Sequence, residues 1–398
     1  MDSERLHLLD GIRGFALLGI LLVHMPAFQY SFNFEPDEKM PWLEQLSLHF
    51  VHIFADSSFL PLFAFMFGAS VILLKRSLEK KGLNTKIVFV RRFLFLAGLG
   101  AIHGVVLWEG DILLPYSVAA FLVLVLFLHC KPLTCLLWGI GLWLGPVLVS
   151  LVLRPLGWIT SSYVNVMDLL YLVILPSPAE WLLELIYNWA DALPMFLIGM
   201  YIFQTKLFTH AVEQQQRNRY LAIFCLAIGL PLKALSHVAY LPLGDDLLSI
   251  SNILVTLGYL FGIVYAYTTS IGRKWFRPFE FVGKMSLTNY LTHTIVFTLI
   301  FIPAGHLFAG VGIVQEIGMF WGTVVAFITI GLQALFSAWW LSKFSYGPVE
   351  WIWRLWTYWK WSPISKSDFA HDVKHADHRK PTALTQHSER KHKKSSAL

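Results

Sequence analysis

Charged residues are scarce in this sequence. Only 14% of the 398 residues are charged, whereas 56% are hydrophobic and 15% are aromatic. In a soluble globular domain about a quarter of the residues are charged, because its surface must be solvated. The composition therefore excludes an ordinary soluble protein, and it also excludes a disordered chain, which needs low hydrophobicity. It indicates a polytopic membrane protein.

Cysteine is also rare. The three cysteines lie in or beside apolar runs without CxxC or Cys/His spacing, which excludes a disulfide scaffold and a structural zinc site. We expect no metal cofactor. A cleavable signal peptide is also missing, because the first apolar run contains Asp10 and Arg13 and lacks a small-residue cleavage site. We expect this first span to be retained.

Apolar stretches of membrane-spanning length recur along the chain. With about 17–25 residues for each span, the sequence predicts an all-α bundle of about ten transmembrane helices. Segment 157–185 is semi-apolar and predicts an interfacial or re-entrant helix. The ten predicted spans are 8–28, 57–74, 93–109, 112–130, 133–153, 186–204, 220–240, 247–269, 286–304 and 318–342.

Charge alternates between successive connections. Loops 75–92, 205–219 and 270–285 are rich in Lys and Arg, whereas loops 29–56, 109–111 and 241–246 carry carboxylates. Short basic loops stay in the cytoplasm, so we expect both termini to be cytoplasmic in a multi-pass protein of the inner membrane. The tail, 361–398, carries eight Lys/Arg against four Asp/Glu and few apolar residues, which predicts disorder.

Ionisable side chains inside the predicted spans are the first candidates for function, because their burial in a bilayer is costly. Asp10 and Arg13 are three residues apart and can pair on a helix, and His24 lies about 21 Å beyond Asp10 along the axis. His103 is a candidate general base that Asp111 can orient. The alternatives stay open: a locked helix end with an ordinary positive anchor, and a histidine bonded to a neighbouring helix.

A second group of candidates lies at the predicted cytoplasmic end. The ninth span begins with Gly283, Lys284, Met285 and Ser286, and we expect Ser286 to cap it. An anionic ligand would meet both the positive end of that helix and the basic loop. The aromatic-rich stretch 346–354 predicts a helix on the membrane surface, with a plain interfacial anchor as the alternative.

Five blocks of the sequence resemble the YeiB family of bacterial inner-membrane proteins, and together they cover most of residues 5–360. The resemblance implies N-terminal acyltransferase-like helices at 1–204, a C-terminal YeiB-type domain of unassigned function at 205–360, and the tail at 361–398. The blocks are RLHLLDGIRGFALLGILLVH, FLPLFAFMFGAS, VRRFLFLAGLGAIHGVVLWEGDILLPYS, GKMSLTNYLTH and SYGPVEWIWRLWTY.

Through its first helices the YeiB family is similar to transmembrane acyltransferases that include the lysosomal heparan glucosaminide acetyltransferase. This resemblance implies transfer of an acyl group from cytoplasmic acyl-CoA to an acceptor, usually a sugar, across the membrane. Many YeiB-like chains carry Asn at the position of His24. The LDxxRG pattern matches Asp10, Arg13 and Gly14, and the RR…GxxHG…GDILxxY pattern matches Arg91, Arg92, His103, Gly104, Gly110, Asp111 and Tyr116.

We therefore expect a membrane acyltransferase whose donor substrate is acyl-CoA. Its expected partners are membrane lipid and a small-molecule or glycan acceptor, not nucleic acid, and a homodimer is left open. The alternatives are a small-metabolite transporter or channel and a non-catalytic scaffold. The candidate catalytic residues are His103, His24, Asp111 and Asp10. The candidate CoA-binding residues are Arg13, Arg91, Arg92, Lys284, Asn289, Tyr290 and Arg354.

Overall fold

A computed structural model describes residues 2–30, 40–108, 110–153, 156, 189–205, 214–238, 244–301 and 317–366. Within these residues every regular element is a helix and no strand occurs. The predicted all-α class is confirmed for this part of the chain. The predicted interfacial segment 157–185 and nearly all of the predicted tail lie outside the described residues.

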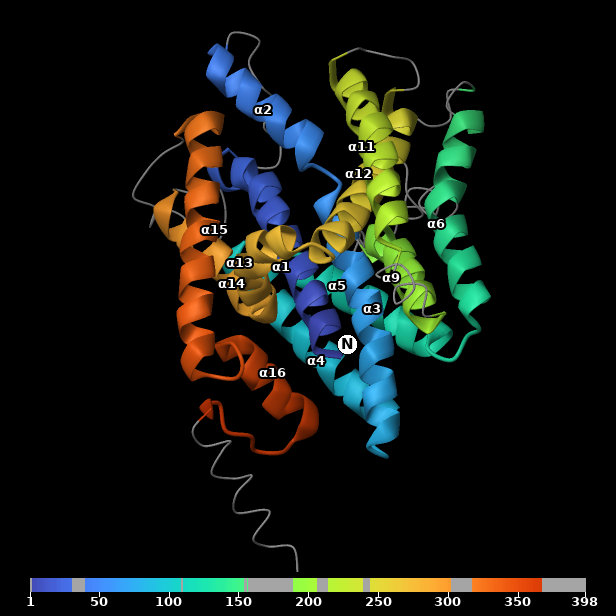
Figure 1. Cartoon of the computed structure of the whole chain (residues 1–398), viewed down its shortest axis with the longest axis vertical. Helices are drawn as coiled ribbons and strands as arrows, with labels where there is room; N and C mark the ends of the chain where they lie inside the picture. Colours follow the sequence, from blue (N-terminus) through green and yellow to red (C-terminus); the bar gives the residue numbers. More distant parts are fainter. Residues whose placement is uncertain are drawn as a thin grey trace, which may run out of the picture.

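The first helix runs through the middle of the molecule (Figure 1). This helix, α1 (Asp2–Gln29), packs against α3 (Phe59–Lys80), α13 (Ser270–Lys284) and α15 (Gly318–Lys343). Because neighbours surround it, apolar side chains on several of its faces are buried. The fully buried ones include Ile12, Ala16, Leu17 and Leu21.

The remaining helices of the bundle pack in pairs. α11 (Gln215–Val238) packs along α12 (Gly244–Tyr267). α9 (Trp189–Gln204) packs against both α3 and α6 (Pro132–Leu153). α4 (Thr85–Ile102) packs against α5 (Leu113–Leu122). Two π-helical turns, His103–Leu107 and Val123–Phe127, continue α4 and α5.

Seven stretches of the described chain are long and apolar enough to cross a membrane. The stretches Leu113–Phe127 and Ala192–Gln204 are apolar but shorter. Large apolar side chains point outward, such as Val125, which is 77% exposed, and a lipid environment would cover them. The total of ten spans and the orientation of the termini stay predictions. The seven stretches are His7–Gln29, Trp42–Lys80, Thr85–Leu107, Pro132–Leu153, Gln215–Ser236, Leu247–Tyr267 and Gly318–Lys343.

Two helices lie where the sequence analysis expected loops. α2 (Trp42–Phe54) occupies part of the predicted loop 29–56, and α13 occupies the predicted loop 270–285. Both helices are short and carry polar residues on one face, so a search for long apolar runs does not detect them. The Thr269 side chain caps α13 by accepting a hydrogen bond from the Gly272 N–H at 3.0 Å.

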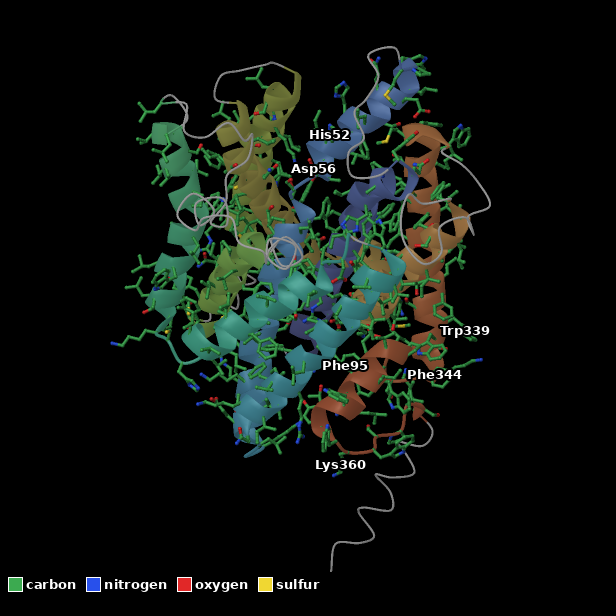
Figure 2. All side chains as sticks on the ribbon, turned by 180° about the vertical axis from the view of Figure 1, so that it is seen from behind. His52, Asp56, Phe95, Trp339, Phe344 and Lys360 are labelled. Atoms are coloured by element: carbon green, nitrogen blue, oxygen red, sulfur yellow. The ribbon has the colours of Figure 1, made fainter. Side chains whose placement is uncertain are left out.

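Different contacts join the helices at the two ends of the molecule. At one end, which we call the basic end, Arg76 of α3 donates to the last carbonyls of α9, and Trp353 and Trp356 of α16 (Pro348–Tyr358) donate to the backbone of Arg92 and Arg91 in α4. At the other end Lys233 of α11 donates to the turn between α2 and α3. Figure 2 places His52 and Asp56 at one end and Lys360 at the other.

The crossing of α1 and α13 is unusually close. A Cβ atom added to Gly14 would collide with the carbonyl oxygen of Phe279, and one added to Gly283 would collide with that of Asp10. Only glycine permits two helix backbones to approach this far. The pair of glycines therefore sets the distance between the two helices.

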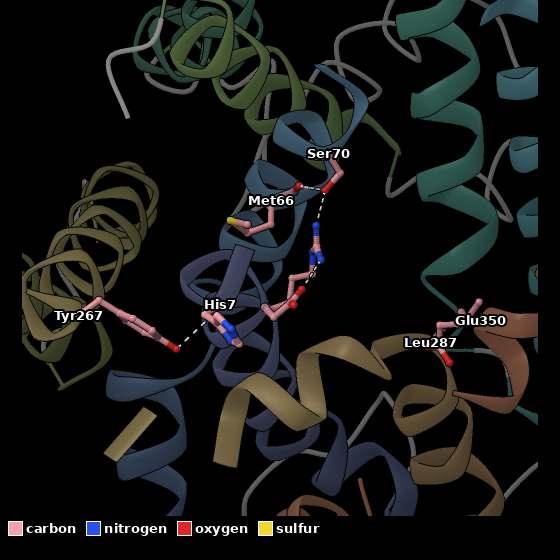
Figure 3. Close-up of polar contacts among 8 residues, drawn as sticks. His7, Met66, Ser70, Tyr267, Leu287 and Glu350 are labelled. Atoms are coloured by element: carbon pink, nitrogen blue, oxygen red, sulfur yellow. Dashed lines mark hydrogen bonds and ion pairs between the residues drawn. The ribbon is translucent and has the colours of Figure 1, made fainter. Parts of the chain in front are cut away.

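Polar contacts beside the two glycines also connect α1 with α13. The Nδ1 atom of His7 lies 2.7 Å from Oε2 of Glu280, which is on α13. The hydroxyl of Tyr267, at the end of α12, lies 3.1 Å from Glu280 Oε1. It also lies 3.3 Å from the His7 carbonyl oxygen (Figure 3). Three helices are thus joined around one buried carboxyl group.

We expect Gly283→Ala to lower the stability of the folded protein by about 1–3 kcal/mol, because the new methyl group overpacks the crossing. The measurement is the melting temperature of the detergent-solubilised protein. Gly98→Ala is the control: its added Cβ meets no atom within 4 Å, and alanine favours a helix over glycine by about 1 kcal/mol. Equal melting temperatures for the two variants would contradict the close crossing.

Candidate functional site

A cavity of about 480 Å³ lies between α1, α3, α4, the start of α14 (Ser286–Ile300) and α16. Its charged lining residues come from the basic end of the molecule, whereas most of its wall is aromatic and aliphatic. The charged residues are Asp10, Arg13, Arg92, Lys284 and Glu350. The apolar and aromatic wall includes Phe63, Phe67, Phe89, Phe93, Leu74, Leu96, Leu113, Tyr116 and Tyr290.

Arg13 is held in a fixed orientation at the cavity wall. Its Nη1 donates to Oδ1 of Asp10 at 2.9 Å, which is the pairing that the three-residue spacing predicts. Its Nη2 donates to the hydroxyl of Ser70 on α3 at 2.6 Å, and that hydroxyl donates to the Met66 carbonyl (Figure 3). Asp10 therefore offsets part of the charge of Arg13 and orients its guanidinium.

Two more cations, Arg92 and Lys284, line the cavity in different surroundings. The guanidinium of Arg92 lies 3.9 Å from the ring centre of Trp353, whose indole N–H donates to the Arg92 carbonyl. An aromatic face stabilises a cation without neutralising it. Lys284 is exposed and forms no ion pair within the described residues. Its charge remains available to a ligand.

Glu350 of α16 caps α14. One carboxylate oxygen accepts from the backbone N–H of Leu287 at 2.7 Å (Figure 3). The same oxygen accepts from the Thr288 N–H at 3.0 Å, and the other oxygen accepts from the Thr288 hydroxyl. The expected cap by Ser286 is wrong: α14 starts at Ser286, and the preceding residue, Met285, makes no side-chain cap. The carboxylate of Glu350 thus occupies the N-terminus of α14, where the sequence predicts an anionic ligand. Burial raises the pKa of Glu350, although its hydrogen bonds act in the opposite direction.

His103 and Asp111 meet behind the inner wall of the cavity. Nδ1 of His103 lies 2.8 Å from Oδ1 of Asp111, and both side chains are buried. Nε2 of His103 hydrogen-bonds the Thr294 hydroxyl at 2.9 Å, and Oδ2 of Asp111 accepts from the Leu114 N–H at 2.7 Å. His103 is the first residue of a π-helical turn, an irregularity that is frequent at functional sites.

Tyr290 separates this pair from the cavity. Its side chain lines the cavity, and its ring centre lies 5.3 Å from that of His103. Its hydroxyl accepts a hydrogen bond from the Ile112 N–H at 3.2 Å. His103 and Asp111 therefore do not line the cavity themselves, and one aromatic ring lies between them and its interior.

His24 lies apart from the cavity, in an aromatic cluster. Its ring centre is 4.8 Å from that of Trp108. Trp108 stacks on Phe28, which stacks on Phe297, at centroid distances of 4.3 and 5.5 Å. None of these four residues lines the cavity.

Three of the predicted ligand-binding residues are not among the cavity lining. Asn289 is buried and donates to the Val282 carbonyl and the Ser337 hydroxyl at 3.1 and 3.0 Å. Arg91 lies over the ring of Trp359 at 4.4 Å. Arg354 lies near the rings of Tyr346 and Tyr358, at 4.9 and 5.1 Å. Their predicted roles stay predictions.

Sequence reasoning missed three residues that shape the site: Ser70, Thr294 and Glu350. Each acts through a partner at least 57 positions away in the chain. Ser70 and Thr294 have short polar side chains inside apolar runs, and such residues are common there. Glu350 alone had a usable signal, since a carboxylate in an aromatic surface helix needs a partner.

The fold and the site together define a class of protein: an all-helical protein of membrane-spanning type with a buried, cationic and aromatic cavity. A family model described as a protein of unknown function, DUF418, matches residues 202–360. The uncharacterised protein YxaH of Bacillus subtilis is 28% identical over 92% of this chain and 97% of its own length. The uncharacterised protein YeiB of Escherichia coli is 28% identical over 88% and 96%.

A third relative, an uncharacterised 39.9 kDa protein of Bacillus acidopullulyticus, is 25% identical over 91% of this chain and 96% of its own length. The chain is thus similar to the YeiB-like proteins over most of its length, and its C-terminal part matches the DUF418 model. The descriptions of these relatives assign no activity, so the function has to be argued from the site.

We expect Glu350→Gln to change how stability depends on pH. A carboxyl group whose pKa is higher in the folded state binds more protons there, so wild-type stability falls as the pH rises above about 4.3 toward the raised pKa. Glutamine keeps an accepting oxygen but cannot ionise. Melting curves from pH 4 to 8 should show the variant gaining stability relative to wild type with rising pH. Parallel curves would contradict the raised pKa of Glu350.

Proposed function

We propose that this protein is an acyl-CoA-dependent acyltransferase of the inner membrane. One observation carries the proposal. A cavity with cations toward its basic end and an aromatic wall is bounded on its inner side by Tyr290, and a buried His103–Asp111 pair lies behind that ring. The resemblance to transmembrane acyltransferases supports it.

The cavity suits a ligand with an anionic head and an apolar tail. Lys284, Arg13 and Arg92 present three cations to phosphate groups, and guanidinium matches phosphate geometry particularly well. The aromatic wall suits an acyl chain and the less polar arm of CoA. A volume of about 480 Å³ lies in the usual range for small-molecule sites, about 300–1,000 Å³. The nucleotide of CoA then remains at the charged mouth.

The chemistry assigned to His103 is general base catalysis. Its Nε2 takes a proton from an acceptor hydroxyl or amine while Asp111 holds the ring through Nδ1. The acceptor oxygen or nitrogen attacks the thioester carbonyl, the C–S bond breaks, and the thiolate of CoA receives the proton from His103. For this step Tyr290 must leave the cavity wall, and the acceptor replaces Thr294 at Nε2.

The other two catalytic candidates have supporting roles in this proposal. Asp10 orients Arg13 and does not touch the reacting atoms. His24 lies eleven residues beyond Arg13, about 16 Å further along α1, beside Trp108. The aromatic rings around His24 suit the apolar face of a sugar ring, so we assign this aromatic cluster to a glycan acceptor.

We expect Lys284→Gln and Arg13→Gln each to weaken acetyl-CoA binding by about tenfold or more, because each removes a charge-assisted contact to phosphate. Arg217→Gln is the matched control, since Arg217 is an exposed arginine that does not line the cavity. Binding is measured by calorimetry on detergent-purified protein at one fixed salt concentration. Equal losses in all three variants would argue against the cavity as the donor site.

We expect His103→Gln to reduce acyl transfer by about 10²–10⁴-fold while acetyl-CoA binding is kept, because His103 is a base and does not line the cavity. The assay follows release of CoA thiol from acetyl-CoA with glucosamine as the probe acceptor. His293→Gln, the same change at another buried histidine of this region that is not a site candidate, serves as the control. Transfer that survives in His103→Gln would remove His103 from the mechanism.

A transporter or channel for a small metabolite is the second candidate. It is favoured by the buried His103–Asp111 pair, because ionisable side chains inside a membrane protein often mark a substrate or proton path. A carrier would take up solute into proteoliposomes without acyl-CoA. Uptake together with no release of CoA thiol would favour this second function.

A further inference from the structure

A second hollow, of about 660 Å³, lies on the outside of the helix bundle between α13 and α15. Lys274 and Arg277 of α13 line it, together with Phe281 and the apolar face of α15 around Leu332. None of its lining residues belongs to the cavity described above. The groove is therefore a separate feature of the molecule.

The exposed face of α13 has the composition of a helix at the boundary between lipid headgroups and hydrocarbon. Ile271 and Trp275 are 70% and 76% exposed, and Lys274 and Arg277 are exposed beside them. Its other face packs against α1. A short helix with exposed cations, tryptophan and isoleucine is typical of helices that lie in the membrane interface.

No carboxylate neutralises the two cations at the groove in the described part of the chain, where neither Lys274 nor Arg277 forms an ion pair. Two cations beside an apolar groove are complementary to a molecule that carries a phosphate on a hydrocarbon chain. Basic residues at this depth attract anionic lipids for the same reason.

The α15 side of the groove offers room for one acyl chain. Leu332 and Leu335 are exposed along it, and a Cβ atom added to Gly331 would meet no atom within 4 Å. A transmembrane helix about 10–12 Å wide would fill a volume of about 660 Å³ with little more than one turn. A thinner hydrocarbon chain fits the groove along its length.

We propose that the groove between α13 and α15 binds one anionic phospholipid, with its phosphate on Lys274 and Arg277 and an acyl chain along Gly331 and Leu332 of α15. The lipid belongs to the leaflet at the basic end of the bundle. Because the groove and the cavity share no residue, this inference stands whether or not the protein transfers acyl groups.

The test uses the full-length protein in detergent and compares phosphatidylglycerol with phosphatidylcholine of identical acyl chains. Native mass spectrometry counts bound lipids, and the rise in melting temperature gives the affinity. We expect wild type to prefer phosphatidylglycerol, and Lys274→Gln/Arg277→Gln to lose that preference by about tenfold or more. Arg217→Gln/Arg219→Gln, in another basic connection, is the charge control and should keep it.

Gly331→Leu tests the acyl-chain part separately. The new side chain fills the groove without a collision of its Cβ, so it should remove the bound lipid and leave the melting temperature in lipid-free detergent unchanged. Gly141→Leu, at another exposed glycine with no atom within 4 Å of its added Cβ, should retain the lipid.

Three results would overturn the proposal. The first is an unchanged lipid preference in the Lys274/Arg277 variant. The second is an equal loss in the Arg217/Arg219 control, which would mean unspecific attraction. The third is a dimer that Gly331→Leu converts to a monomer without loss of lipid, which would assign the groove to a second copy of the chain.

Discussion

The backbone contact between α1 and α13 is the constraint on which the candidate site depends. Helices that pack through side chains lie about 8–10 Å apart. Gly14 and Gly283 remove the side chains at the crossing, so each backbone reaches a carbonyl group of the other helix. This approach brings Asp10 and Arg13 of α1 to the same cavity as Lys284 at the end of α13. The outer face of α13 then carries Lys274 and Arg277 toward α15.

The charged groups around the cavity illustrate how a helical bundle of membrane-spanning type can keep cations inside it. Removal of a charge from water is costly unless a partner compensates it. Arg13 has a carboxylate and a hydroxyl, Arg92 has an indole face, and Glu350 has the N–H groups of α14. Only Arg13 is paired with a carboxylate. The cavity therefore keeps a positive character that favours an anionic ligand.

The parts of this structure that follow from local pattern were predictable from the sequence. Long apolar runs mark helices by length alone, and Asp10 and Arg13 pair because they are one turn apart. The amphipathic helices α2 and α13 lack such runs and were missed. The cap of Glu350 on Leu287 joins residues 63 positions apart, so the sequence shows that this carboxylate needs a partner but not which residue supplies it. Arg91 and Arg92 differ in environment because successive helical residues point about 100° apart, and only the packing decides which one faces the cavity.

Access to His103 depends on one face of α14. Tyr290 and Thr294 are four residues apart, so they lie one above the other on this helix, the first against the cavity and the second on Nε2 of His103. A ring can rotate about its side-chain bonds without a shift of the helix, and Tyr290 is held by a single hydrogen bond of 3.2 Å. A ligand that displaces this ring therefore reaches Thr294 next. Because Glu350 caps the N-terminus of α14, the displacement of Tyr290 that the proposed mechanism requires involves a side chain and not the end of the helix.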